Sequence, residues 1–176
     1  MGFAISLRSD HPSAGSVRAL WSDVQRFEYR PSMALLGYPP HITLAIYDDD
    51  AVREAEIRRA LDNASKNLRA VTLTFDAICS FDGPPMLLWA SPRPSAVLRT
   101  IHGAIHAAIN PTSCRPHYRP GAWKPHCTLG TQVRDDQREA ALAFARRASS
   151  VFDVIFDSLD CIDFPPVAPF ELRKLL

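Results

Sequence analysis

Two short stretches, Pro40-His41-Ile42-Thr43-Leu44 and Pro125-His126-Cys127-Thr128-Leu129, share the pattern proline, histidine, any residue, threonine, leucine. Each follows a proline-containing turn and has the length and composition of a strand. Side chains alternate across a strand, so histidine and threonine point to one face and the residues between and after them to the other. Both stretches therefore predict a strand with a polar His-Thr face and an apolar face that packs in the core, beneath the helices of its own half of the chain.

The segments around the two stretches follow one another in the same order in both halves. A second match pairs Phe75-Asp76-Ala77-Ile78-Cys79 with Phe156-Asp157-Ser158-Leu159-Asp160. The two offsets, 85 and 81 residues, differ by four, which a change in helix and loop length explains. We therefore expect an internal duplication of a βαβαβ-type unit, with halves of about 1–84 and 85–176 that form a single bilobal domain over residues 1–176.

The fifteen prolines divide the chain into elements, because proline begins helices, ends them and bounds strands. Apolar residues at helical spacing predict four helices, and an acidic run, Asp48 to Asp50, is expected to cap the second of them. Asp136 with Glu139 predicts a capping box for the fourth. The expected helices lie within 12–30, 48–68, 94–110 and 136–148, and the expected strands at 3–7, 41–47, 71–81, 86–90, 126–130, 151–164 (one strand or two) and 169–175.

The composition is that of an ordinary globular protein. Of the 176 residues, 47% are hydrophobic and 22% charged, and 20 Lys+Arg against 19 Asp+Glu give a formal charge of +1, so any polyanion must be held by a local site. The apolar runs are short and the N-terminal residues do not resemble a secretory signal, so we expect no membrane contact and a cytoplasmic protein. Four cysteines without a CxxC motif predict reduced, mostly buried thiols.

If the two halves are related by a pseudo-twofold axis, both His-Thr faces line one groove. Hydrolysis of a phosphodiester needs a base for the water proton, an acid for the leaving ribose oxygen and donors for the other phosphate oxygens. Imidazole can serve as base or acid near neutral pH, and a threonine hydroxyl can donate to a phosphate oxygen. The predicted catalytic residues are therefore His41, Thr43, His126 and Thr128, with no metal and no other cofactor.

Cations and aromatic residues gather in the segment 115–124, directly before the second motif. Such a loop can hold a phosphate and stack a base, so Arg119, Trp123 and Lys124 are candidate substrate-binding residues. Tyr38 is the corresponding candidate before the first motif. The alternative for this segment is an ordinary basic surface loop with Trp123 packed against the core.

The doubled His-x-Thr motif in a small α+β chain resembles the 2H phosphoesterase superfamily, and in particular its bacterial 2′-5′ RNA ligase and cyclic phosphodiesterase branch. The resemblance covers nearly the whole chain. It implies a bilobal α+β fold in which two mainly antiparallel sheets face a central groove, with the helices outside. It also implies metal-independent hydrolysis of 2′,3′-cyclic phosphates or related ribose phosphodiesters, with reversible 2′-5′ ligation. By resemblance His126 activates water and His41 protonates the leaving oxygen, although the residues themselves leave this assignment open.

The expected partners are RNA with a cyclic-phosphate end, a 2′-5′ linked oligonucleotide or a small cyclic nucleotide, with no obligate protein partner. Three alternatives stay open. The groove could bind RNA ends or nucleotides without turnover, or the motif could be kept for structural reasons. A zinc site is the third, but alternation turns Cys127 away from His126. His102 and His106 lie four apart on one helix face and could bind a metal, but we expect them to be structural or solvated.

Overall fold

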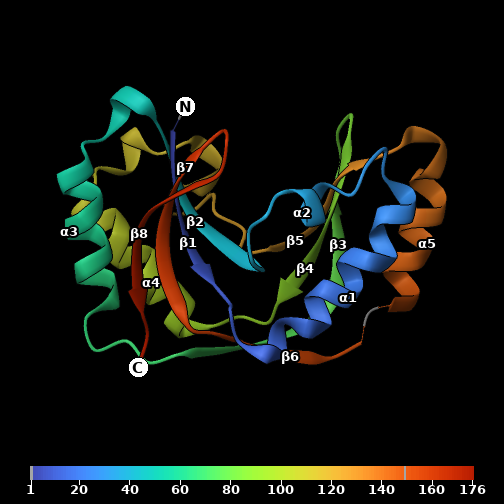
Figure 1. Ribbon diagram of the computed structural model, residues 1–176, viewed down its shortest axis with the longest axis horizontal. Helices are drawn as coiled ribbons and strands as arrows, with labels where there is room; N and C mark the ends of the chain where they lie inside the picture. Colours follow the sequence, from blue (N-terminus) through green and yellow to red (C-terminus); the bar gives the residue numbers. More distant parts are fainter. Residues whose placement is uncertain (1, 149) are drawn as a thin grey trace.

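The computed structural model describes residues 2–148 and 150–176 and has an α+β fold (Figure 1). Its eight strands form one sheet in the order β6-β3-β4-β5-β2-β1-β7-β8, and every neighbouring pair is antiparallel. The strands are β1 (Gly2–Arg8), β2 (His41–Asp48), β3 (Val71–Phe81), β4 (Met86–Pro92), β5 (Cys127–Val133), β6 (Phe152–Phe156), β7 (Ser158–Phe164) and β8 (Ala168–Lys174). The helices are α1 (Gly15–Val24), α2 (Ser32–Leu35), α3 (Glu54–Ser65), α4 (Ala96–Ala108) and α5 (Arg138–Ala148).

The sheet divides into two four-stranded lobes that are joined at one place. β2 and β5 share a single register pair, Ile42 with Cys127, and separate on either side of it. One lobe contains β2, β1, β7 and β8, with α3 and α4 on its outer side; the other contains β5, β4, β3 and β6, with α1 and α5 outside (Figure 1). The α+β, bilobal prediction is confirmed, but the two sheets expected from the resemblance are one continuous sheet.

The lobes interlace the two halves of the chain. Helix α4, from the second half, packs on α3 and on β2, and helix α1, from the first half, packs on β5. The expectation that each motif strand packs beneath helices of its own half is therefore wrong. The apolar faces of the two strands are covered as predicted, however, since Ile42, Leu44, Cys127 and Leu129 are all fully buried. Because each lobe needs elements from both halves, neither half can bury its apolar surface alone.

Both predicted helix caps are wrong. The acidic run forms a 3-10 turn, Asp49–Ala51, and α3 begins later, where the Glu56 carboxylate accepts the backbone N–H of Arg53 at 3.0 Å. Asp136 lies inside another 3-10 turn, Asp135–Gln137, directly before α5. Aspartate favours turns as strongly as caps because its side chain hydrogen-bonds to nearby backbone, so the acidic residues alone do not locate a helix start.

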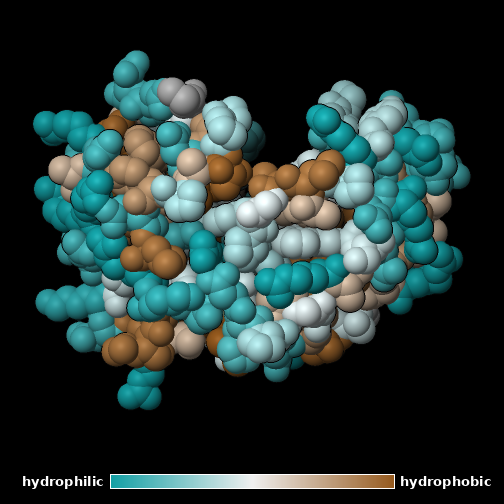
Figure 2. Space-filling view, viewed as in Figure 1, coloured by the Kyte–Doolittle hydropathy of each residue, from teal (hydrophilic) through white to brown (hydrophobic). Residues whose placement is uncertain are grey.

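Three of the four cysteines, Cys114, Cys127 and Cys161, are buried thiols, and Cys79 is partly buried. None of the helices in the described part of the chain is both long and apolar enough to cross a lipid bilayer. Between the lobes the molecular surface is deeply hollowed (Figure 2). The two motif strands, β2 and β5, meet beneath this hollow (Figure 1).

Candidate active site

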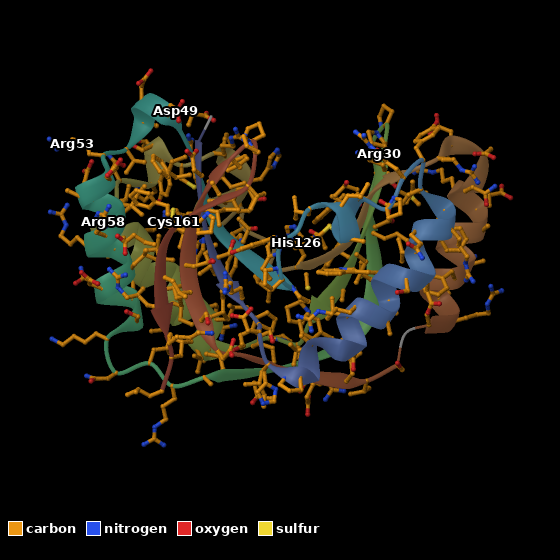
Figure 3. The ribbon with its side chains drawn as sticks, viewed as in Figure 1. Arg30, Asp49, Arg53, Arg58, His126 and Cys161 are labelled. Atoms are coloured by element: carbon orange, nitrogen blue, oxygen red, sulfur yellow. The ribbon has the colours of Figure 1, made fainter. Side chains whose placement is uncertain are left out.

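The two motifs meet at the junction of the lobes. Ile42 of β2 pairs with Cys127 of β5 at this junction. His41 and Thr43 are the neighbours of Ile42 on β2, and His126 and Thr128 are the neighbours of Cys127, with His126 directly before the start of β5. All four side chains are partly buried, in contrast to the fully buried residues between them. The register places both His-Thr sets on the same face of the sheet. Figure 3 shows His126 between the lobes, whereas Cys161 lies in one lobe and Arg30 in the other.

The two imidazoles are oriented by the same backbone interaction. Nδ1 of His41 donates to the carbonyl of Pro39, and Nδ1 of His126 donates to the carbonyl of Lys124, each at 2.8 Å. A carbonyl oxygen only accepts, so Nδ1 must carry the proton. In the neutral ring Nε2 is then left as a proton acceptor, and in the charged ring it is a donor. Each histidine can therefore accept a proton at Nε2 when neutral and donate one from Nε2 when charged.

Two tryptophans hold the threonine carbonyls of the motifs. The indole N–H of Trp123 donates to the carbonyl of Thr43 at 3.0 Å, and that of Trp21 to the carbonyl of Thr128 at 2.9 Å. β2 and β5 diverge at these positions, so neither strand provides a hydrogen-bond donor for the threonine carbonyl of the other. The indoles replace the missing strand partner and fix the backbone next to each histidine.

A buried polar network forms the wall behind His41. The ring of Tyr38 lies against the His41 ring, with 4.7 Å between centroids, and its hydroxyl donates to the Asp160 carboxylate at 2.5 Å. Arg8 donates to the other oxygen of Asp160 at 3.1 Å. Burial, together with a smaller effect of the nearby His126, lowers the pKa of His41 to about 4. Burial raises the pKa of Asp160 to about 6. His41 is therefore held neutral at neutral pH.

Aromatic rings and one cation surround His126. Phe81 and Trp89 stack on each other at 4.9 Å, and the His126 ring meets both of them edge-on. The Lys124 ammonium lies 5.6 Å from the Phe81 ring and 5.8 Å from the Trp89 ring. Burial, and next the positive charge of Lys124, lower the pKa of His126, while its bond to the Lys124 carbonyl opposes the shift. A cavity of about 520 Å³ opens beside these groups and is lined by His126, Phe81 and Lys124, among others.

The four predicted substrate-binding residues differ in their surroundings. Lys124 is exposed and faces the cavity beside His126. Trp123 is partly buried, stacked on His102 at 4.0 Å, and lines a second cavity. Arg119 donates to the carbonyls of Cys114 and Thr112 and so braces its own loop. Tyr38 is only 6% exposed, so its buried ring supports His41 and offers no free face for stacking a base.

His102 and His106 are buried rather than solvated. Nε2 of each ring donates a hydrogen bond to the carbonyl of Tyr118, at 2.9 Å for His102 and 3.0 Å for His106, because a carbonyl oxygen can only accept. Burial lowers the pKa of both, that of His102 to about 4. Both fasten the loop before the second motif to α4, and His102 supports Trp123 from behind.

Sequence reasoning missed the residues that form the walls around the histidines. Arg8 and Asp160 come from β1 and β7, and Phe81 and Trp89 from β3 and β4, all distant in sequence from the motifs. One signal was present in the sequence: Asp160 ends the second repeated stretch, and the equivalent position in the first stretch is Cys79, so a carboxylate stands where the first copy has a thiol. No cluster of three or more His, Cys, Asp or Glu side chains that could hold a metal ion occurs in residues 2–148 and 150–176.

A family profile described as the 2′-5′ RNA ligase superfamily matches residues 15–164. The chain belongs to the 2′-5′ RNA ligase superfamily. This membership confirms the resemblance drawn from the two motifs. A relative in Bacillus licheniformis, named "Putative phosphoesterase", is 27% identical over 135 residues, which cover 75% of each chain.

Solved structures of the superfamily fold extend over almost the whole chain. Escherichia coli LigT in apo form aligns with a TM-score of 0.63 at 13% identity, covering 99% of this chain and 96% of LigT. LigT complexed with 3′-AMP aligns with a TM-score of 0.61 at 15% identity, covering 99% and 97%. Usb1 of Kluyveromyces marxianus aligns with a TM-score of 0.52 at 12% identity, covering 99% and 96%. At these identities the likeness shows a shared fold, and membership of the superfamily supports a phosphoesterase or RNA-ligase-like function.

Proposed function

We propose that this protein is a metal-independent phosphodiesterase that opens 2′,3′-cyclic phosphates or related ribose phosphodiesters by two-histidine acid/base catalysis. The observation that carries the proposal is the matched orientation of His41 and His126. Both are fixed through Nδ1 at 2.8 Å on strands that meet at Ile42 and Cys127, which leaves both Nε2 atoms for the reaction. Thr43 and Thr128 are proposed to donate to the non-bridging phosphate oxygens.

The proposed step is hydrolysis by direct displacement at phosphorus. One Nε2 accepts a proton from water while the water oxygen bonds to phosphorus. The bond from phosphorus to a ribose oxygen breaks on the opposite side, and that oxygen takes the proton from the other Nε2. A cyclic phosphate and water thus give one phosphomonoester, and the histidines exchange protonation states. If the 5′-hydroxyl of a second RNA chain attacks the cyclic phosphate in place of water, its proton goes to the base, the bond from phosphorus to the 3′-oxygen breaks and that oxygen takes the proton of the acid. The product is a 2′-5′ linkage, so the same groups can carry out ligation.

The electrostatic surroundings favour His41 as the base and His126 as the acid. His41 has a pKa of about 4, and the charge of His126 contributes to that low value, so the first proton taken up by the pair goes to His126. A neutral His41 can accept the water proton, and a charged His126 can protonate the leaving oxygen. This assignment is the reverse of the one that the resemblance implied.

The nucleotide complexes of LigT fit a nucleotide ligand for this chain. LigT has been solved with 3′-AMP, one of the two phosphomonoesters, 2′ or 3′, that opening of a 2′,3′-cyclic phosphate can yield, and with ATP and NADP+. RNA ends, 2′-5′ linked oligonucleotides and small cyclic nucleotides are therefore the proposed partners.

The test is hydrolysis of nucleoside 2′,3′-cyclic phosphates in the presence of EDTA, with His41→Ala and His126→Ala as variants. We expect turnover with a bell-shaped pH profile in the wild type and strong loss in both variants. Activity abolished by EDTA would rule out the metal-independent mechanism. Binding without product for every substrate would instead favour the alternative function, an RNA-end or nucleotide-binding module that uses the same groove.

A further inference from the structure

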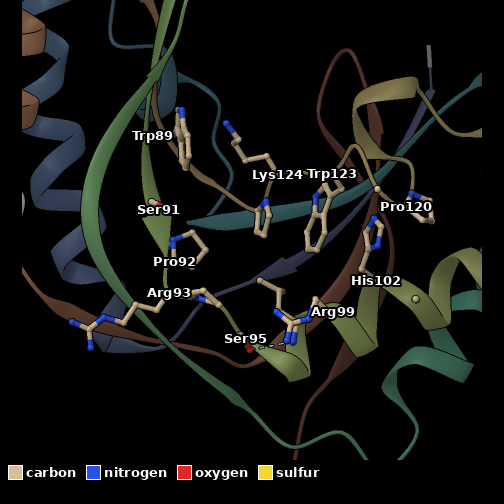
Figure 4. Close-up of a pocket in the computed structure, with 15 residues that line it drawn as sticks. Trp89, Ser91, Pro92, Arg93, Ser95, Arg99, His102, Pro120, Trp123 and Lys124 are labelled. Atoms are coloured by element: carbon tan, nitrogen blue, oxygen red, sulfur yellow. Dashed lines mark hydrogen bonds between the residues drawn. The ribbon is translucent and has the colours of Figure 1, made fainter.

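A second cavity, of about 590 Å³, adjoins the candidate active site. It lies between the N-terminal half of α4, the end of β4 and the loop before the second motif (Figure 4). Lys124 lines both this cavity and the one that contains His126, so the two spaces share a wall. Trp89, which contacts the His126 ring, also lines the second cavity. A chain-like ligand held at His126 could therefore continue into this space.

The helix beside the cavity contains a glycine that packing does not explain. Gly103 lies in the interior of α4, where glycine disfavours the helix relative to alanine. It is exposed and lines the cavity, and a Cβ built on it would meet no atom within 4 Å. No close approach of another element therefore requires glycine here. The missing side chain keeps this wall of the cavity open.

The cavity has a cation and an aromatic face suited to a nucleotide. Arg99 is exposed on α4, and its guanidinium forms no ion pair with another residue among those described. Trp123 is covered on one side by His102, with the two ring planes 4° apart, and presents its other side to the cavity (Figure 4). A base can stack on such a ring and a phosphate can pair with a guanidinium.

We propose that this cavity binds the nucleotide on the 5′ side of the terminal ribose, so that the preferred substrate is an RNA end of at least two nucleotides and not a cyclic mononucleotide. The inference rests on the proposed function, because it takes the reacting phosphate to lie at His41 and His126. The base of that nucleotide stacks on Trp123, and the phosphate that links it to the terminal ribose lies between Lys124 and Arg99.

A second arginine at the same cavity provides a matched control. Arg93 also lines the cavity, but its Nε donates to Asp76 at 2.9 Å and its side chain points away from the cavity in Figure 4. Arg93→Gln and Arg99→Gln remove the same charge from the protein as a whole. Only the second removes a cation from the proposed phosphate position.

The experiment compares kcat/KM for the dinucleotide ApA ending in a 2′,3′-cyclic phosphate with kcat/KM for adenosine 2′,3′-cyclic phosphate. We expect a preference for the dinucleotide of at least tenfold, reduced roughly tenfold by Arg99→Gln and less than twofold by Arg93→Gln. Gly103→Leu fills the cavity and should abolish the preference. Gly103→Ala, which also favours the helix but adds only a methyl group, should reduce it much less.

Equal kcat/KM for the two substrates in the wild type, or equal effects of the two arginine variants, would overturn the proposal. If neither substrate is turned over, the proposed function fails, and the cavity is judged by binding alone. The probes are then ApA with a 3′-phosphate and 3′-AMP. Tighter binding of the dinucleotide that is lost in Arg99→Gln and Gly103→Leu would support the cavity, and equal affinities would refute it.

Discussion

The surroundings of His41 and His126 differ although the backbone holds both rings identically. Each Nδ1 donates at 2.8 Å to the carbonyl two residues earlier, and each neighbouring threonine carbonyl accepts an indole N–H. Behind His41 lies the buried Tyr38-Asp160 pair, whereas rings and Lys124 surround His126. The repeated motif thus sets tautomer and orientation symmetrically, and we propose that the non-repeated surroundings determine which ring holds the proton.

The strongest test of this asymmetry removes each imidazole in turn. His41→Ala and His126→Ala are each expected to lower kcat/KM for a cyclic phosphate by about 10²- to 10⁴-fold, the usual contribution of a general acid or base. A nucleoside 3′-(p-nitrophenyl) phosphate needs no acid because p-nitrophenolate leaves unprotonated. It should restore much of the activity of His126→Ala but not of His41→Ala. Rescue of His41→Ala alone would reverse the assignment.

The next test replaces, one at a time, an aromatic residue that contacts each histidine. Tyr38→Leu removes the ring against His41 and leaves Asp160 without its hydroxyl donor, so we expect a loss of about 2–4 kcal/mol in the free energy of unfolding. Water that reaches His41 should raise its pKa from about 4 toward the ordinary value of 6.5. Titration of the histidine C2 protons by NMR measures this shift. Phe81→Leu is the control, and it should affect His126 and leave His41 unchanged.

Stability should also depend on pH through the buried histidines. His41, His102, His106 and His126 all have pKa values lowered by burial, so the unfolded chain binds more protons than the native state below pH 6.5. Their contribution to stability is complete above pH 6.5 and is lost as the pH falls toward 4.

Asp160 acts in the opposite direction over the same pH range. Its native pKa of about 6 lies above the ordinary aspartate pKa of 3.8, so between these two values the native state binds the extra proton and gains stability on acidification. Four histidines outweigh one carboxyl group, and urea unfolding at pH 7, 6 and 5 should show falling midpoints. In Asp160→Asn the fall should be steeper, because the opposing contribution is gone. A midpoint that rises from pH 7 to 5 would contradict the prediction.

The smallest effects concern the tryptophan hydrogen bonds, which both motifs have. Trp21→Phe and Trp123→Phe each remove one indole N–H from a threonine carbonyl while keeping a ring in place. We expect each to lower the free energy of unfolding by about 1–2 kcal/mol, because a strand carbonyl is left without its donor. Chemical denaturation measures both. Clearly unequal losses would mean that the two carbonyls do not have equivalent support.

Much of the fold and of the candidate site was predictable from local patterns. Strand 71–81 was located exactly as observed, and the duplicated motif identified His41, Thr43, His126 and Thr128 as residues that share a face. These predictions depend only on alternation and on turn residues, which act over a few positions. The caps failed because aspartate serves turns as well as helices, and the burial of His102 and His106 was missed because it depends on a loop that packs over α4.

The amino-acid pattern was sufficient to predict two strands with a His-Thr face, the repetition of this motif and the α+β class. The reason is that the alternation of side chains along a strand depends only on neighbouring residues. It could not show that the two halves exchange helices, that one Ile42-Cys127 pair joins the lobes, or that a carboxylate on β7 stands behind the histidine on β2. Those relations join residues that lie far apart in the sequence, and only packing of the whole sheet brings them into contact. The difference in protonation that we propose for the two histidines depends on the same packing, because desolvation depends on every element that surrounds the ring.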